Sequence, residues 1–409
     1  MPAAFLGAGY DPSALDPASL AELTELDHSL FQAWNMGESI MFAWSREPGG
    51  VCVLAAPHYR IVEPYRGGHG GEATNSYHEE INHILAGPKQ ISLEAMRRLR
   101  HILGPDALQV RVALRTDTAV NAERVTGLVT RYGVTRVNER AVALLDIVGF
   151  SLRTPFEQVA MLNSLSYSVN SACRQLLSRN VEIDFARTTT GDGFYLWNRN
   201  RSLEANIALY KLLMLILTDN AVARRKAHGF PVPALRAALH VGEHYEFYQV
   251  EGLNPTPFSY IVGHVTIELA RMLAGALPGQ ILIGDFALAG QVAASEGAGG
   301  VSGDPAPIGP PEFIERTAGM LDRLKGMAVA GDRIRDIRCY LTGEGMPDGS
   351  YRIRRYPITD KHGMPHWVFN AKLNIHLSNG APIFLGIQDG ELNVLGLSEV
   401  PPGEQPAGG

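Results

Sequence analysis

The chain has 409 residues and a formal net charge of −6, with 36 lysines and arginines against 42 aspartates and glutamates. This length predicts two or three domains, and a hydrophobic fraction of 45% is sufficient for a substantial core. Because the chain is mildly acidic and has no basic block, we expect no nucleic-acid binding.

Cysteine content and hydropathy favour a cytoplasmic protein without membrane contact. Cys52, Cys173 and Cys339 are far apart and odd in number, so they form neither a disulfide pattern nor a zinc pattern. The N-terminus lacks the basic start and apolar block of a signal peptide. The longest apolar run, 212–217, is too short to span a bilayer.

Residues 1–135 say little about function. A glycine-rich loop covers 65–74, and its His69 has no partner at metal-ligand spacing. We expect an N-terminal α/β region that is either a regulatory domain or an elaboration of the domain that follows. The patterns predict helices over 17–34, capped by Asp16, and 91–103, and strands over 51–56 and 108–114.

The stretch 141–151, AVALLDIVGFS, predicts a buried central strand that ends on Asp146. An acid at a strand end lies at the edge of a sheet, where a ligand can reach it. Gly149 permits a sharp turn, and the N–H groups that follow suit a phosphate. The alternative is a strand-end aspartate that only caps the next helix.

A second carboxylate follows in the stretch 181–197, VEIDFARTTTGDGFYLW. Strand-like alternation on both sides of Thr190-Gly191-Asp192-Gly193 predicts a β-hairpin with Asp192 at its tip. An Asp-Gly tip is also a common turn sequence without further function. Two carboxylates on neighbouring strand ends would instead suit a pair of divalent cations.

The rest of the chain alternates between helical patterns, strands and loops. The segment 244–260 predicts a rigid, aromatic-rich loop, and 293–311 a flexible surface loop. Beyond Gly345, alternating segments predict a small C-terminal β module that covers the preceding domain, mediates dimerisation or binds a signal, followed by a disordered tail. The predicted helices are 156–177, 203–227 and 265–273, and the predicted strands are 235–241, 281–283, 337–341, 351–356, 367–377 and 382–387.

Six motifs in a fixed order resemble the catalytic domain of class III nucleotide cyclases, the adenylate and guanylate cyclase superfamily. The resemblance covers about 136–345, half of the chain. It implies three regions: 1–135, a catalytic domain over 136–345, and 346–409. The motifs are the strand with Asp146-Ile-x-Gly-Phe, the Gly191-Asp192 hairpin, Leu235-Arg236-Ala-Ala-Leu-His240-Val-Gly242, Gly263 with Arg271, Pro278-Gly279-Gln280-Ile281-Leu282-Ile283, and Leu324-Lys325-Gly326.

The resemblance implies an α+β, ferredoxin-like domain, with an antiparallel-rich sheet and flanking helices, that cyclises a nucleoside triphosphate. Asp146, Asp192 and the carbonyl of Ile147 match the family's ligands for two Mg²⁺ or Mn²⁺ ions, which prefer oxygen donors. Arg271 matches the arginine that stabilises transition-state charge. Gly149, Phe150 and Lys325 match the triphosphate-binding positions. The family forms each site across a homodimer interface.

Three positions depart from the purine-specific pattern. Thr188 stands where those members carry a lysine, Tyr260 where they carry an acidic or polar partner, and Ile267 where they carry a ribose-orienting asparagine. The chain is similar here to the bacterial anti-phage pyrimidine cyclases of Pycsar systems. This similarity implies UTP, or else CTP, as substrate, and a cyclic product that a separate effector detects. Arg187 is a further candidate for base recognition if its side chain points inward.

Two other hypotheses remain open. The first is a divergent adenylate or guanylate cyclase in ordinary signalling, with the C-terminal module as its sensor. The second is a pseudo-cyclase that binds a nucleotide or a partner without catalysis.

Overall fold

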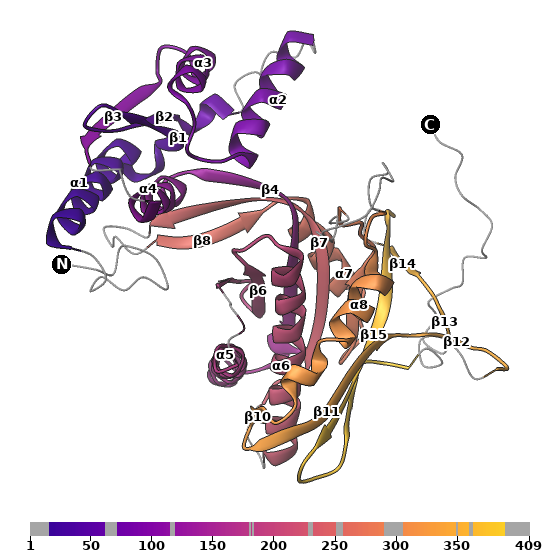
Figure 1. Ribbon diagram of the computed structural model, residues 1–409. Helices are drawn as coiled ribbons and strands as arrows, with labels where there is room; N and C mark the ends of the chain where they lie inside the picture. The colour runs from indigo at the N-terminus through magenta and orange to yellow at the C-terminus, as the bar shows by residue number, and fades with distance from the viewer. Residues whose placement is uncertain are drawn as a thin grey trace, which may run out of the picture. The chain divides into compact units, whose positions relative to one another are not determined.

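The computed structural model divides the chain into two compact units, 1–138 with 243–263, and 139–242 with 264–409. Two long strands, β4 (Val134–Ile147) and β7 (Leu235–Val250), run through both units (Figure 1). Helices combine with a mixed sheet, which confirms the α+β class. The structure describes residues 16–61, 72–114, 119–179, 181, 184–227, 232–250, 257–289, 306–348, 351–359 and 363–388.

The first unit contains a three-stranded antiparallel sheet in the order β1-β2-β3. One hydrophobic cluster joins this sheet to α1 and α4, and a second joins its other face to α2 and α3. The sheet is therefore covered by helices on both faces. The elements are α1 (Pro17–Trp34), η2 (Asn35–Gly37), β1 (Ser39–Glu47), β2 (Gly50–Pro57), η3 (His58–Ile61), α2 (Glu72–Ala86), α3 (Leu93–Leu103), β3 (Leu108–Ala113) and α4 (Ala119–Arg131).

The elements expected in this unit are confirmed. Asp16 caps α1 by accepting hydrogen bonds from the backbone N–H groups of Ala18 and Ser19, each at 3.0 Å. The buried residues of α1, from Leu23 to Trp34, recur every three or four positions, so one face of the helix packs on the sheet. Residues 65–71 of the expected glycine-rich loop, with His69, lie outside the described residues, and 72–74 are the start of α2 rather than a loop.

The aromatic segment after His244 differs from expectation. Its described residues are strand and not loop, because β7 continues to Val250 and pairs antiparallel with β8 (Pro257–Val262). The aromatic residues Tyr245 and Phe247 alternate with their neighbours along the strand. The prolines at 255 and 257 favoured a loop instead.

The second unit contains a sheet in the order β10-β11-β15-β9-β7-β4-β6-β5, in which the β7–β9 pair is parallel. The expected hairpin is confirmed, although its first strand starts later than predicted. The elements are η5 (Phe150–Leu152), α5 (Pro155–Leu177), β5 (Phe185–Thr189), β6 (Gly193–Asn198), α6 (Leu203–Lys226), α7 (His264–Ala274), β9 (Ile281–Gly284), α8 (Pro310–Ala318), η6 (Leu321–Leu324), β10 (Ala328–Val329), β11 (Asp332–Leu341), β12 (Gly343–Gly345), β13 (Tyr351–Ile353), β14 (Tyr356–Thr359), β15 (Pro365–Leu377) and β16 (Ile383–Leu385).

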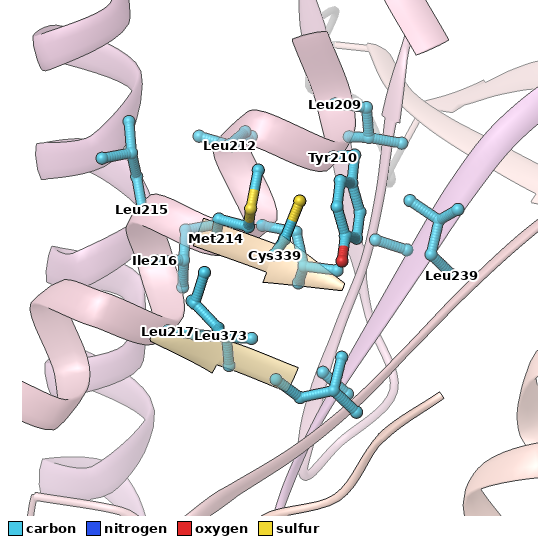
Figure 2. Packing of buried hydrophobic residues seen from close by; sticks show 14 of the residues in the cluster. Leu209, Tyr210, Leu212, Met214, Leu215, Ile216, Leu217, Leu239, Cys339 and Leu373 are labelled. Carbon is cyan, nitrogen blue, oxygen red and sulfur yellow. The ribbon is translucent and has the colours of Figure 1, made fainter. Parts of the chain in front are cut away.

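The core of this unit lies between one face of the sheet and helices α5, α6 and α8. Figure 2 shows side chains of α6 packed against Leu239 of β7, Cys339 of β11 and Leu373 of β15. By length and composition α6 is apolar enough to cross a membrane, but 94% of its apolar window is buried inside the unit. This burial is typical of a core helix.

The C-terminal segment is not a separate β module. Its longest strand, β15, lies inside the main sheet between β11 and β9, and β14 and β16 pair with it. Alternation predicted the strand but not its partners, because strand pairing between distant segments leaves no local pattern. The described residues between 346 and 388 therefore belong to the second unit and do not form a third compact unit.

Candidate functional site

The two predicted carboxylates lie together at one edge of the main sheet. Asp146 ends β4 and pairs in register with Gly193 of β6. The backbone N–H of Ile147 donates to the carbonyl of Asp192 at 3.0 Å. A Cβ on Gly193 would lie 1.8 Å from the carbonyl oxygen of Leu145, so only glycine allows this close approach of the two strands.

A tight turn follows Asp146. Gly149 has φ +67°, a left-handed conformation that favours glycine. The short helix η5 begins at Phe150, whose side chain packs against the core. Thr154 and Glu157 then form a reciprocal capping box at the start of α5. Sequence and structure thus agree on a strand, a turn and a helix, and Asp146 is not the residue that caps the helix.

Arg236 of β7 contacts Asp146, a contact that the sequence motif around Arg236 does not predict. Its Nε donates to Oδ2 of Asp146 at 2.5 Å, and its Nη1 donates to the carbonyl of Ala276 at 3.0 Å. In the sequence, Arg236 is a single arginine within the apolar strand segment LRAAL. A charged side chain in such a segment indicates a buried acidic partner. The side chain of Asp146 is 13% exposed and that of Arg236 29%.

The electrostatics of Asp146 combine opposing effects. Burial raises the pKa of the Asp146 carboxyl above its ordinary value, the hydrogen bond and charge of Arg236 lower it, and the neighbouring Asp192 raises it again. Two carboxylates that repel each other at a partly buried sheet edge form a region of negative potential. Such a pair attracts a cation, which relieves the repulsion.

The donor set fits a hard divalent cation such as Mg²⁺ or Mn²⁺. Asp146 and Asp192 offer carboxylate oxygens, and the expected third ligand, the carbonyl of Ile147, is a further oxygen donor from the same strand end. Within the described ranges, no group of three or more His, Cys, Asp or Glu side chains is arranged to hold a metal ion. A cation at this edge would therefore complete its coordination with backbone, water or substrate oxygens.

Asp146 and Thr188 lie on the same face of the sheet. The residues of β4 that face the core are Ala141, Ala143, Leu145 and Ile147, so Asp146 points to the opposite face because side chains alternate. Tyr195 pairs with Thr188, and its hydroxyl donates to the carbonyl of Thr266 on α7 at 2.9 Å. Thr188 therefore shares the face of Asp146, which we call the α7 face.

The other base-recognition candidates lie elsewhere. Arg187 points to the core side, where its Nη1 donates to the Ser166 hydroxyl of α5 at 3.1 Å and its guanidinium lies 5.2 Å from the ring centroid of Phe194. It does not share a face with Thr188. Tyr260 belongs to the first unit, where its ring stacks on that of Phe247 with centroids 5.9 Å apart.

Arg271 and Lys325 lie on other elements of the second unit. Arg271 is on α7, where its Nη1 is 3.9 Å from Oε1 of Glu268. The ammonium of Lys325 contacts Asp322 at 2.7 Å and Asp336 at 3.6 Å.

Lys325 and Asp146 are separated by a helix length. The carbonyl of Lys325 accepts from Arg179, directly after the C-terminal end of α5, whereas Asp146 precedes the N-terminal end of that helix. Because α5 has 23 residues, it is roughly 34 Å long. Within one chain, Lys325 is not brought to the carboxylates.

No protein-family model matches the sequence, and no curated protein matches it either. Among solved structures, the adenylyl cyclase CyaB from P. aeruginosa shares 12% identity over 61% of this chain and 97% of its own, with a TM-score of 0.31. The guanylate cyclase domain of RhGC from Catenaria anguillulae, in complex with GTP, shares 12% identity over 58% of this chain and 97% of its own, with a TM-score of 0.33.

Proposed function

We propose that the protein is a nucleotide cyclase that converts a nucleoside triphosphate to a 3′,5′-cyclic nucleotide and pyrophosphate. One observation carries the proposal: the pairing of β4 with β6 brings Asp146 and Asp192 to one sheet edge, beside a glycine turn. The sequence motifs predict this arrangement. An Asp146 that only capped the following helix would not explain it.

In this reaction, the ribose 3′-oxygen forms a bond to the α-phosphorus, and the bond from that phosphorus to the bridging oxygen of the β-phosphate breaks. The proton of the 3′-hydroxyl goes to solvent, and pyrophosphate leaves. Asp146, Asp192 and the carbonyl of Ile147 would hold two Mg²⁺ or Mn²⁺ ions. When bound, such ions lower the pKa of the 3′-hydroxyl and neutralise the triphosphate.

The protein's own groups supply the remaining contributions. Arg236 orients the Asp146 carboxylate through its 2.5 Å hydrogen bond and favours its ionised form. The turn at Gly149 and Phe150 presents backbone N–H groups to the phosphates. Arg271 stabilises the charge that accumulates on the α-phosphate oxygens in the transition state, and Lys325 binds the leaving pyrophosphate.

A homodimer with two shared sites accommodates these roles. Lys325 lies a helix length from Asp146 within one chain, so a single copy does not unite them. In a head-to-tail pair of copies, the carboxylates of one chain face Arg271 and Lys325 of the other. This arrangement is the family's own, and the separation along α5 supports it.

The base is a pyrimidine, with UTP ahead of CTP. A purine pocket must pair its buried donors and acceptors with the base edge, and an unpaired polar group costs about 1–3 kcal/mol. Thr188 offers a hydroxyl on the α7 face, which donates or accepts and so imposes no purine edge. Tyr260 is the second candidate from the sequence, and contact with its bulky ring would favour a one-ring base. Arg187 takes part only if its side chain leaves the core side. The product acts as an anti-phage alarm that a separate effector detects.

Competition between all four nucleoside triphosphates tests the substrate. Purified protein is incubated with an equimolar mixture and Mn²⁺, and the cyclic products are resolved by mass spectrometry. We expect cyclic UMP to dominate, and Tyr260→Ala to relax the selectivity. Dominant cyclic AMP or cyclic GMP would overturn the pyrimidine assignment and favour the divergent purine cyclase instead.

A further inference from the structure

Glu268 lies on α7, one turn before Arg271, and is surrounded by basic side chains. Its side chain is only 15% exposed. Oε2 lies 2.5 Å from Nδ1 of His366, while Oε1 lies 3.6 Å from Nε2 of His264 and 3.9 Å from Nη1 of Arg271. One carboxylate oxygen is therefore anchored, and the other faces the guanidinium.

His366, which holds the Glu268 carboxylate, belongs to a strand inside the sheet. His366 is on β15, and its side chain is 6% exposed. The next residue, Trp367, accepts a backbone hydrogen bond from Asp285 at 2.9 Å, which ties this end of β15 to the segment after β9. The position of the Glu268 carboxylate is thus set by a buried ring on a sheet strand, and not only by its own helix.

The contact between Arg271 and Glu268 differs from a typical ion pair within a helix. Its contact with Glu268, at 3.9 Å, is beyond hydrogen-bond distance, and its side chain stays 37% exposed. In α8, by contrast, Arg316 donates to Glu312 through both Nε and Nη2. A guanidinium attracted by a fixed charge at this distance has a preferred direction while its side chain stays partly exposed.

We propose that Glu268, anchored by His366, is a positioning residue that orients Arg271 toward the reacting phosphate. The inference rests on the proposed function, because that function gives Arg271 its role. The C-terminal strand β15 would then contribute to catalysis through His366. Holding a charged group in place before the reaction strengthens its effect on the transition state, because no reorganisation is needed.

A double-mutant cycle tests the proposal. Glu268→Gln keeps the shape and removes the charge, so we expect kcat to fall about tenfold while KM changes by less than about twofold. In an Arg271→Ala background, the same substitution should change kcat by less than about twofold. Glu312→Gln, which disturbs an exposed ion pair on α8, is the matched control and should leave kcat unchanged.

The outcomes separate this proposal from the function on which it rests. If the unsubstituted protein makes no cyclic product, or Arg271→Ala keeps full activity, the role of Arg271 falls and the inference falls with it. If both behave as proposed but Glu268→Gln lowers kcat equally in the two backgrounds, Glu268 acts only through the fold. An unchanged kcat in Glu268→Gln also overturns the positioning role.

Discussion

Asp146 depends on its neighbours for its chemistry. Burial and the neighbouring Asp192 raise the pKa of its carboxyl, and the 2.5 Å hydrogen bond and charge of Arg236 oppose that rise only in part. The hydrogen bonds of Arg236 are divided between Asp146 and the carbonyl of Ala276, so its charge only partly neutralises the two acids. A doubly charged cation would be bound most tightly in such an environment.

Replacing Arg236 should shift the pH dependence of turnover. Arg236 lowers the pKa of Asp146, so Arg236→Met should raise that pKa further. Asp146 would then become protonated at a higher pH as the solution is acidified, and the acidic limb of the kcat/KM profile should move to higher pH. Arg338→Met, at a side chain that is 75% exposed, serves as the control. An acidic limb that stays in place would show that Asp146 is not the titrating group.

His240 predicts an acid-sensitive fold. Burial lowers its pKa from an ordinary value near 6.5 to about 4, and within the described segments its Nδ1 has no hydrogen-bond partner. A depressed folded pKa means that the unfolded chain binds the proton first, so stability is lost as pH falls from about 6.5 toward 4. The contribution of His240 amounts to about 2 kcal/mol between pH 7 and pH 5.

Urea denaturation of the unsubstituted protein and of His240→Gln at both pH values measures this loss. The variant should lose less unfolding free energy on acidification, because glutamine does not titrate. An identical loss in the two proteins would assign the acid sensitivity to other groups.

At the scale of elements, local pattern predicted most of what it could encode. Local patterns predicted α1, α5, α6, α7, β2 and β3 to within a few residues, and alternation predicted β6 and β15. These elements have an amphipathic or uniformly apolar sequence and clear caps. The positions of Asp146 and Asp192 could be predicted for the same reason, because each residue lies at a local boundary between a strand and a turn.

Contacts between distant segments could not be predicted. Neither the insertion of β15 between β11 and β9 nor the extension of β7 to Val250 is visible in a window of a few residues. The same limit applies to side-chain partners, such as Arg236 for Asp146 and His366 for Glu268, which are 90 and 98 positions apart. Sequence suggests that a charged side chain needs a partner, but not which one it finds.

The place of β15 predicts the effect of truncation. A chain that ends at Gly345 would lose the strand between β11 and β9, together with Phe369, Ala371, Leu373 and Ile375 of the core. We expect this chain to aggregate or to lack a cooperative thermal transition. A chain that ends at Gln388 keeps every described strand and serves as the control. A stable, active chain ending at Gly345 would instead support the hypothesis that the C-terminal segment is a separate module.

At the scale of the whole molecule, shared sites predict complementation between inactive copies. Asp146→Ala subunits should lack turnover as homodimers, and Arg271→Ala subunits should retain only a small residual turnover. A mixed dimer should recover up to one working site, because one of its two sites has both an intact carboxylate pair and an intact arginine. Activity is measured after the two variants are mixed under conditions where subunit exchange is demonstrated. No recovery despite exchange would contradict sites shared between subunits.

The most direct test of the central claim is the turnover of each nucleoside triphosphate with Mn²⁺, compared between the unsubstituted protein and Asp146→Asn and Asp192→Asn. These substitutions preserve side-chain size and remove one negative charge each. We predict a 3′,5′-cyclic product and pyrophosphate in equal amounts from the unsubstituted protein. For both variants we predict a loss of at least about a hundredfold, with unchanged thermal unfolding. No cyclic product from any of the four triphosphates, or full activity in either variant, would contradict the account.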